Sequence, residues 1–273
     1  MTRGTNDGQE EVSYVDEDHD VCLGVEDGSF WFRHRNECIA GLVTRYPFKG
    51  TFYDVGGGNG YVARRLLDDE LDVVLVEPGL RGAENARLKR GIPKVVCGTL
   101  SSAGIPVGSA GAVGIFDVVE HVADDRGFIR EIATVLQPGG MLYLTVPAYG
   151  WMWSNADVVA GHHRRYTRAS IYEAVAPFFD VKFVSYYFAP LLLPIALMRA
   201  LPHRLGVRGS APTEVEHGTD GGMVVRVMER LLARELRRLE AGRTVRMGAS
   251  LIMAARRLHT PPGWKDGKNA IDP

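Results

Sequence analysis

Thr51-Phe-Tyr-Asp-Val-Gly-Gly-Gly-Asn-Gly60 is the stretch that decides the fold of this chain. A short β-rich run leads directly into glycines, which let the chain turn sharply and let its backbone approach a ligand closely. Residues 61–67 have a helical pattern, and a helix there points its N-terminal N–H groups at that ligand. Glu77 ends the next apolar run, about twenty positions after the first glycine, where a carboxylate can accept hydrogen bonds from ribose hydroxyls. The stretch therefore predicts a ligand with a ribose at a strand–loop–helix turn.

The glycine spacing discriminates between kinds of ligand. The dinucleotide fingerprint G-x-G-x-x-G, started at Gly56, would place its third glycine at position 61, which is Tyr61. Bulk at that position is awkward for close helix–strand packing. The pattern that fits is acid-x-G-x-G-x-G, with Asp54 as the acid and Gly56, Gly58 and Gly60 as the glycines. The spacing thus argues against a nicotinamide dinucleotide.

Apolar β-rich runs and helical patterns alternate along the rest of the chain. This order predicts an α/β fold: a Rossmann-like, doubly wound, mainly parallel seven-stranded sheet. The same order predicts an N-terminal helical cap before the sheet and a helical insertion before the last strand. We expect strands at residues 51–55, 72–76, 94–97, 110–118, 141–146, 179–188 and 249–255. We expect helices at residues 29–46, 61–67, 80–90, 124–136 and 223–240. Ligands of such sheets bind outside the carboxyl ends of the strands.

The expected domain organisation is a single domain over residues 21–260. Within it, 21–50 form the helical cap, 51–147 the cofactor-binding core, and 148–260 the lid, the helical insertion and the last strands. Residues 1–20 are polar and acidic, and we expect them to be disordered, like the tail at 261–273. Residues 205–222 are rich in Gly, Ser, Pro and Thr and predict a mobile loop. The role of the insertion at 189–247 stays open.

Charge and cysteine content narrow the function classes. The 273 residues carry a formal net charge of -1, so the composition gives no general basic surface for nucleic acid. Cys22, Cys38 and Cys97 form no C-x-x-C pair or zinc spacing, which favours reduced thiols in a cytoplasmic protein. No secretory signal is recognised at the start. The apolar run at 187–201 is too short and too interrupted to span a membrane, and either covers a pocket or lies at a membrane interface.

The acid-x-G-x-G-x-G pattern resembles the first motif of the class I S-adenosylmethionine-dependent methyltransferases. Phe116-Asp-Val-Val-Glu-His-Val122 resembles the "DVLEHV" segment of small-molecule members related to the quinone-biosynthesis enzymes, a type 11/12-like group. Leu136-Gln-Pro-Gly-Gly140 resembles their "LKPGG" turn. The resemblance implies S-adenosyl-L-methionine as cofactor and S-adenosyl-L-homocysteine as product.

The resemblance also implies which residues hold the cofactor. The loop wraps its methionine part, Asp54 orients the loop, and Glu77 holds the ribose. Many family members carry an acid after the third strand that accepts a hydrogen bond from the adenine amino group, but this chain has Gly98-Thr-Leu100 there. In this chain the hydroxyl or the backbone oxygen of Thr99 would be the acceptor. The implied cofactor-binding residues are Asp54, Gly56, Gly57, Gly58, Gly60, Glu77, Pro78, Thr99, Leu100 and Asp117.

Two further segments resemble a bacterial subgroup: Phe30-Trp-Phe-Arg-His-Arg-Asn36 and Gly161-His-His-Arg-Arg-Tyr-Thr167. A hydroxyl or acidic-carbon acceptor needs a general base, and histidine suits that role. The candidate catalytic residues are His162, His121 and Tyr166. The candidate substrate-binding residues are Trp31, Arg35, Trp151, Trp153, Arg164 and Arg165.

Each candidate has a structural alternative. His121 could instead cap the following helix, and Arg165 could pair with Asp157 and anchor a lid. Core packing is the favoured role for Phe32, which lies on a helix. No Asp, His or Cys cluster has metal-ligand spacing, so no metal is expected.

Methyl transfer to a small molecule is the favoured function, with oxygen as the preferred acceptor atom and carbon or nitrogen as alternatives. Secondary-metabolite, glycan or lipid biosynthesis is the expected setting. The competing hypotheses are a non-catalytic module that binds S-adenosylmethionine and, less favoured, a nicotinamide-dependent oxidoreductase. We expect a small-molecule substrate, no nucleic acid, no transmembrane segment with peripheral membrane contact left open, and a monomer or homodimer.

Overall fold

The computed structural model describes residues 16–206 and 222–259, so the termini and most of the expected loop at 205–222 lie outside the described residues. Its centre is a seven-stranded sheet in the order β3-β2-β1-β4-β5-β7-β6. β7 runs antiparallel to both its neighbours and the other strands are parallel, which confirms the predicted Rossmann-like fold. The strands are β1 (Phe52–Val55), β2 (Val73–Glu77), β3 (Val95–Cys97), β4 (Ala110–Phe116), β5 (Leu136–Pro147), β6 (Phe179–Tyr187) and β7 (Ser250–Arg257).

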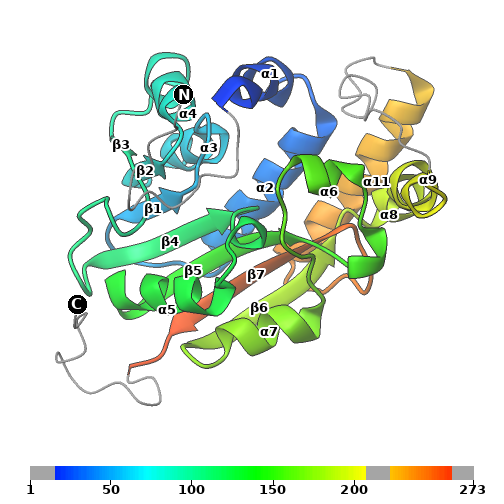
Figure 1. The fold of residues 1–273 in the computed structure, drawn as a ribbon. Coiled ribbons are helices and arrows are strands. Elements are labelled where there is room, and N and C mark those ends of the chain that lie inside the picture. The colour runs from blue at the N-terminus through cyan, green and yellow to red at the C-terminus, as the bar shows by residue number, and fades with distance from the viewer. Residues whose placement is uncertain (1–15, 207–221, 260–273) are drawn as a thin grey trace, which may run out of the picture.

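Helices cover both faces of this sheet (Figure 1). α2 (Phe30–Arg45), α3 (Tyr61–Asp68), α4 (Leu80–Leu88) and α11 (Met223–Glu240) share one face, and α5 (Asp125–Val135) and α7 (Arg168–Val175) share the other. Each face has its own apolar core. β4 is buried along its whole length, as a central parallel strand should be. The remaining helical elements are α1 (Asp16–Glu26), η1 (Val119–His121), η2 (Gly150–Met152), α6 (Asn155–Val159), α8 (Ala189–Ile195), η3 (Ala196–Ala200) and α9 (Leu201–Arg204).

Helix boundaries follow the local capping signals. Ser29 accepts a hydrogen bond from the Trp31 N–H and starts α2, and Asp124 accepts one from Gly127 N and starts α5. These boundaries lie within a residue of those expected from the sequence. β5 begins earlier than expected, at Leu136, so the Pro138-Gly-Gly turn is instead an irregular start of this strand.

The N-terminal helix α1 differs from the sequence-based expectation. It begins at Asp16, inside the segment expected to be disordered, and packs against α4. Asp20, one of the acidic residues that suggested disorder, pairs with Arg81 at 2.7 Å, and Glu26 near the end of the helix pairs with Arg90 at 2.9 Å. The charge therefore stabilises a docked helix.

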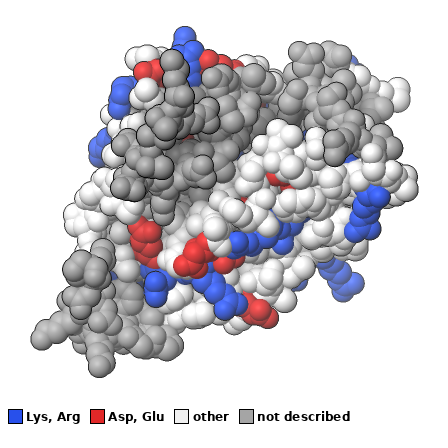
Figure 2. All heavy atoms as spheres, viewed as in Figure 1, with Lys and Arg blue, Asp and Glu red and all other residues white. Residues whose placement is uncertain are grey.

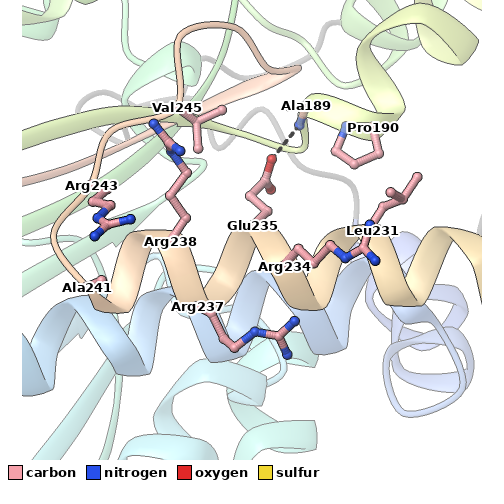
Figure 3. A pocket seen from close by; sticks show the side chains of 10 residues that line it. All are labelled: Ala189, Pro190, Leu231, Arg234, Glu235, Arg237, Arg238, Ala241, Arg243 and Val245. Atoms are coloured by element: carbon pink, nitrogen blue, oxygen red, sulfur yellow. Dashed lines mark hydrogen bonds between the residues drawn. The ribbon is translucent and has the colours of Figure 1, made fainter.

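The helical insertion lies between β6 and β7. Helix α11 packs along α2, and its buried Glu235 accepts a hydrogen bond from the backbone N–H of Ala189 at 2.8 Å (Figure 3). A second bond, from the N–H of Phe188, is 2.6 Å long. Arg234, Arg238 and Arg243 line an open groove beside this junction. These bonds thus hold α11 of the insertion against the turn between β6 and α8.

Charged side chains of both signs are interspersed among the described residues on the face seen in Figure 2. None of the helices within the described ranges has both the length and the apolarity needed to cross a bilayer.

Candidate active site

The glycine loop after β1 adopts the conformation that its sequence predicts. Gly56, Gly58 and Gly60 have φ angles of 70°, 54° and 82°, a region that favours glycine. A Cβ atom on Gly56 would lie 2.7 Å from Val118 Cγ2. The loop therefore touches the segment that follows β4, and two strand ends border one site.

Asp54 lies beneath this loop with 1% of its surface exposed. Its Oδ2 has no hydrogen-bond partner in the part of the chain that the structure describes, and it would meet a Cβ atom on Gly57 at 2.9 Å. Burial raises the pKa of Asp54 to about 7, and the charge of Glu77 adds to this, while Arg35 opposes it. Asp54 thus supports the loop from below with a carboxyl group that titrates near neutral pH.

Glu77, at the end of β2, joins the loop to the start of α4. Its Oε2 accepts a hydrogen bond from Gly58 N and its Oε1 accepts one from Gly79 N, both at 2.8 Å. The Nε2 atom of His19 lies 3.9 Å from Oε1. The carboxylate for which we predict ribose binding therefore lies against the glycine loop, with the His19 side chain of α1 next to it.

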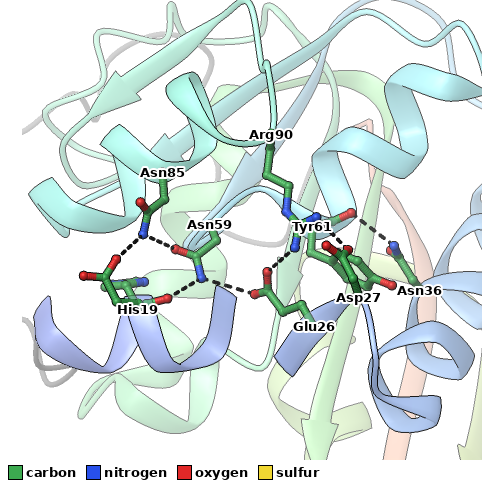
Figure 4. Close-up of polar contacts among 9 residues, drawn as sticks. His19, Glu26, Asp27, Asn36, Asn59, Tyr61, Asn85 and Arg90 are labelled. Atoms are coloured by element: carbon green, nitrogen blue, oxygen red, sulfur yellow. Dashed lines mark hydrogen bonds and ion pairs between the residues drawn. The ribbon is translucent and has the colours of Figure 1, made fainter. Parts of the chain in front are cut away.

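A polar network that the sequence analysis missed holds α1 over the loop (Figure 4). Asn59 donates to the His19 carbonyl at 2.8 Å, and Asn85 donates to Asn59 Oδ1 at 3.1 Å and to Asp20 at 3.0 Å. Arg90 adds ion pairs with Glu26 and with Asp27. Asn59 at the centre of the glycine motif was the one available signal, because a buried amide there needs several partners.

The residues expected near the adenine lie at the ends of β2 and β3. The Thr99 hydroxyl is within 2.9 Å of the Ser101 hydroxyl and 3.2 Å of the Ser102 hydroxyl. Leu100 is buried and Pro78 is half-buried. This corner offers hydroxyl groups and apolar surface.

Arg35 and Asp117 meet at the end of β4. Arg35 donates from Nε to Asp117 Oδ2 at 2.7 Å and from Nη2 to the Phe116 carbonyl at 2.9 Å. Asp117 itself has a φ of 58°, which is uncommon for a residue with a side chain. The neighbouring Asn36 donates to the carbonyl of Tyr61 at 3.1 Å. The first two turns of α2 thus bond the end of β4 and the residue that follows the glycine loop.

Glu120, His121 and His162 form a cluster at the same edge of the sheet. One donor atom from each lies within 4.8 Å of the others, and the two imidazole rings pack edge to face with centroids 4.7 Å apart. Glu120 is fully buried, and within residues 16–206 and 222–259 no other residue hydrogen-bonds its carboxylate oxygens. Burial raises the pKa of Glu120, with a contribution from Asp117, and burial lowers the pKa of His121 to about 4. At neutral pH His121 is therefore an uncharged imidazole.

Asp157 at the start of α6 holds the segment that covers this cluster. It accepts hydrogen bonds from Arg165 Nε at 2.6 Å and from Ser154 N at 2.8 Å, and His162 Nδ1 lies 3.0 Å away. Burial alone would raise the pKa of Asp157, but the bonds from His162 and Arg165 outweigh it and the pKa falls below its usual value. The predicted Arg165–Asp157 pair is confirmed.

The neighbours of Arg165 are also fixed by ion pairs and hydrogen bonds. Arg164 Nη1 lies 2.8 Å from Asp125, and the hydroxyl of the buried Tyr166 donates to the same carboxylate at 2.9 Å. Tyr166 also pairs with Ala148 through its backbone. Arg164, Arg165 and Tyr166 thus hold the segment after α6 against α5 and the end of β5.

Some of the aromatic candidate residues pack in the core, and others are partly exposed to solvent. Trp31 stacks on Phe188 with ring centroids 3.9 Å apart and belongs to the core between α2 and the insertion. Trp151 stacks on Tyr149 and is 43% exposed, and Trp153 is half-buried. Phe32 is half-buried and packs edge to face on Tyr61.

Comparisons with known proteins agree with this geometry. Residues 53–144 match the family model described as "Methyltransferase domain". A probable S-adenosylmethionine-dependent methyltransferase of Mycolicibacterium smegmatis is 28% identical over 133 residues, which is 45% of this chain and 48% of that protein. A similarly named protein of Mycobacterium tuberculosis is 27% identical over 119 residues, 44% of this chain and 43% of that protein. The matched region thus spans about half the length of these curated relatives.

Solved structures share the fold at lower identity. One of these structures is the complex between the Haloferax volcanii Trm112 methyltransferase activator and the putative methyltransferase. A chain of that complex matches with a TM-score of 0.58 and 19% identity, and the match covers 92% of this chain and 100% of that chain. Phosphoethanolamine N-methyltransferase 2 of Haemonchus contortus, bound to S-adenosyl-L-methionine, has a TM-score of 0.57 and 17% identity, covering 91% and 58%. The family model and the curated relatives therefore make residues 53–144 similar to a methyltransferase domain, and the solved structures show that the whole fold is of the kind found in S-adenosylmethionine-dependent methyltransferases.

Proposed function

We propose that this chain transfers the methyl group of S-adenosylmethionine to a small-molecule acceptor, with oxygen as the preferred atom and carbon or nitrogen as alternatives. One observation carries the proposal: the glycine loop and the Glu120–His121–His162 cluster meet at one edge of the sheet. Val118, which touches Gly56, stands two residues before Glu120. A donor held by the loop would thus lie beside polar groups that could face an acceptor.

In the proposed reaction the acceptor attacks the methyl carbon, the carbon–sulfur bond breaks, and its electron pair stays on sulfur. Because the sulfonium is already activated, the protein mainly aligns the two reactants and excludes water. Asp54 and the glycines would orient the methionine part, Glu77 would bind the ribose, and Thr99 and Leu100 would border the adenine. A hydroxyl acceptor also loses a proton, for which His162 and His121 are the candidate acceptors.

The remaining candidates would shape the acceptor pocket. Tyr166, Arg164 and Arg165 already bond Asp125 and Asp157, so we assign them to positioning of the covering segment. Trp151 and Trp153 would supply apolar contacts, and Arg35 would hold Asp117. Nitrogen is retained as an alternative acceptor atom because the Haemonchus contortus neighbour is named as an N-methyltransferase.

A non-catalytic module would share the cofactor-binding loop but would have no use for two imidazoles beside it. The cluster therefore favours an enzyme over the module. A cytoplasmic role in secondary-metabolite, glycan or lipid biosynthesis, as monomer or homodimer, remains part of the proposal.

Calorimetric titration with S-adenosylmethionine, S-adenosylhomocysteine and NADH tests the cofactor. We expect binding of the first two and none of NADH, and a loss of affinity in Glu77→Ala and Asp54→Ala variants whose circular dichroism is unchanged. Release of S-adenosylhomocysteine with hydroxylated acceptors would then establish catalysis. Binding of NADH alone would overturn the proposal.

A further inference from the structure

We propose that Glu120, His121 and His162 form a binding site for one divalent transition-metal ion of the Zn²⁺ class. The three residues come from two segments: η1 after β4 supplies the first two, and the segment after α6 supplies the third. Two imidazoles and one carboxylate are a ligand set known for Zn²⁺ and Fe²⁺. Mg²⁺ and Ca²⁺ prefer oxygen ligands, so nitrogen donors favour a transition metal.

The donor atoms are close enough for one ion. They lie within 4.8 Å of one another. Ligand atoms at about 2.1 Å from a Zn²⁺ ion are separated by roughly 3.4 Å in a tetrahedral site. Small rotations of the three side chains would close that difference.

The surroundings of Glu120 are an independent indication that a cation binds here. A buried carboxylate without hydrogen bonds is costly, and native structures normally supply a partner. Neither oxygen of Glu120 has a partner on another of the described residues, although the side chain is fully buried. The nearby guanidinium groups of Arg35 and Arg165 are hydrogen-bonded to Asp117 and Asp157. A bound metal ion would give the Glu120 carboxylate its missing counter-charge.

Both histidines already have the outer contact that metal-binding histidines usually have. Their second ring nitrogen typically donates to a carboxylate or to a backbone carbonyl, which fixes the tautomer and the ring orientation. His162 Nδ1 faces the Asp157 carboxylate at 3.0 Å, and His121 is hydrogen-bonded to the backbone of Ala160. The other nitrogen of each ring is then left for a metal ion.

Three protein ligands leave coordination positions open, as in catalytic zinc sites. Under the proposed function, these positions would take an oxygen atom of the methyl acceptor, and with the metal bound the two imidazoles would act as ligands in place of proton acceptors. This last step rests on the proposed function, whereas the metal site itself does not. The inference departs from the sequence-based expectation that no metal is bound, because that expectation used ligand spacing along the chain. Here, the folded chain brings His162 to Glu120 and His121.

The test measures metal binding without turnover. Untagged protein is dialysed against a chelator and titrated with Zn²⁺ in competition with a chromogenic chelator, and bound metal is measured by elemental analysis. We expect one ion per chain, and Zn²⁺ bound in preference to Mg²⁺. Co²⁺ should give visible absorption bands typical of low coordination. Glu120→Gln and His162→Ala should each weaken Zn²⁺ binding at least about tenfold.

His163→Ala is the matched control. This exposed histidine neighbours His162, and its backbone N–H donates to the Glu120 carbonyl, a bond that the substitution leaves in place. It should bind Zn²⁺ like the native protein, as should Cys97→Ser, which removes an exposed thiol. The inference is overturned if the native protein binds no transition metal, or if folded Glu120→Gln and His162→Ala bind it unchanged. S-adenosylmethionine binding without a metal site would overturn this inference and leave the proposed function standing.

Discussion

Asp54 links the stability of the protein to pH. Its carboxyl group has a pKa of about 7 in the folded chain, against 3.8 for the ordinary group. Between these values the folded state holds a proton that the unfolded state has lost, so the free energy of unfolding falls as pH rises from about 4 to about 7. Over the whole window the effect is on the order of 4 kcal/mol.

Replacing Asp54 with Asn should remove this pH dependence. Denaturant unfolding at pH 5 and at pH 8 gives the two free energies for the native protein and for Asp54→Asn. We expect the difference between the two pH values to shrink in the variant. An unchanged difference would mean that other groups cause the slope.

Gly57 tests how closely the loop packs on Asp54. A Cβ atom there would lie 2.9 Å from Asp54 Oδ2 and 2.9 Å from Leu75 Cδ1, and both atoms are buried. Gly57→Ala should displace the loop and weaken S-adenosylhomocysteine binding at least about tenfold, or about 1.4 kcal/mol, in a calorimetric titration.

Gly139 provides the control for Gly57. It has a φ of 77°, and no atom of the described residues lies within 4 Å of a Cβ atom built there, so Gly139→Ala introduces backbone strain far from the loop. This variant should lose about 1 kcal/mol of stability and keep its affinity for S-adenosylhomocysteine. Equal affinities in the two variants would argue against a cofactor role for the loop.

At the scale of elements, Glu235 of α11 joins three parts of the fold. It bonds the N–H groups of Phe188 and Ala189 at the start of α8, and it lies 3.0 Å from His34 Nε2 on α2. Glu235→Ala would leave these buried groups without an acceptor, which costs about 1–3 kcal/mol for each. We expect the free energy of unfolding to fall by several kcal/mol.

Glu229 on the same helix is the matched comparison. It pairs with Arg33 at 2.8 Å, and both side chains are nearly half exposed, 44% and 45%. Exposed pairs contribute less than about 1 kcal/mol. Glu229→Ala should therefore unfold at nearly the native denaturant concentration, and a similar loss in both variants would refute the role assigned to Glu235.

At the scale of the whole molecule, the sequence predicts the sheet well because its signals are local. Each strand has its own apolar run, and glycines and prolines mark the turns. The sequence pattern fails to predict the structure where contacts between residues far apart in the chain determine it. α1 is acidic and looks disordered, yet Arg81 and Arg90 hold it. The cluster joins Glu120 to His162, which are far apart in sequence, and only the fold brings them together.

The contacts of α1 predict how cofactor binding spreads through the molecule. α1 packs on α4 and bonds the glycine loop through Asn59, whereas α11 packs on α2 and the β6–α8 corner. A ligand that binds only the folded state stabilises first the segments whose opening releases it. Saturating S-adenosylhomocysteine should therefore slow amide hydrogen exchange in the glycine loop, the end of β2 and α1, and change little in α11.

Hydrogen exchange with and without ligand, read by mass spectrometry, measures this pattern. Glu77→Gln keeps a side chain of the same size but removes the charge that would hold the ribose, so the protection should require a higher ligand concentration. Arg90→Ala removes the ion pairs to Glu26 and Asp27, and it should raise exchange in α1 before ligand is added. Equal protection of α1 and α11 would show that the molecule opens as one unit, with α1 having no special part in retaining the cofactor.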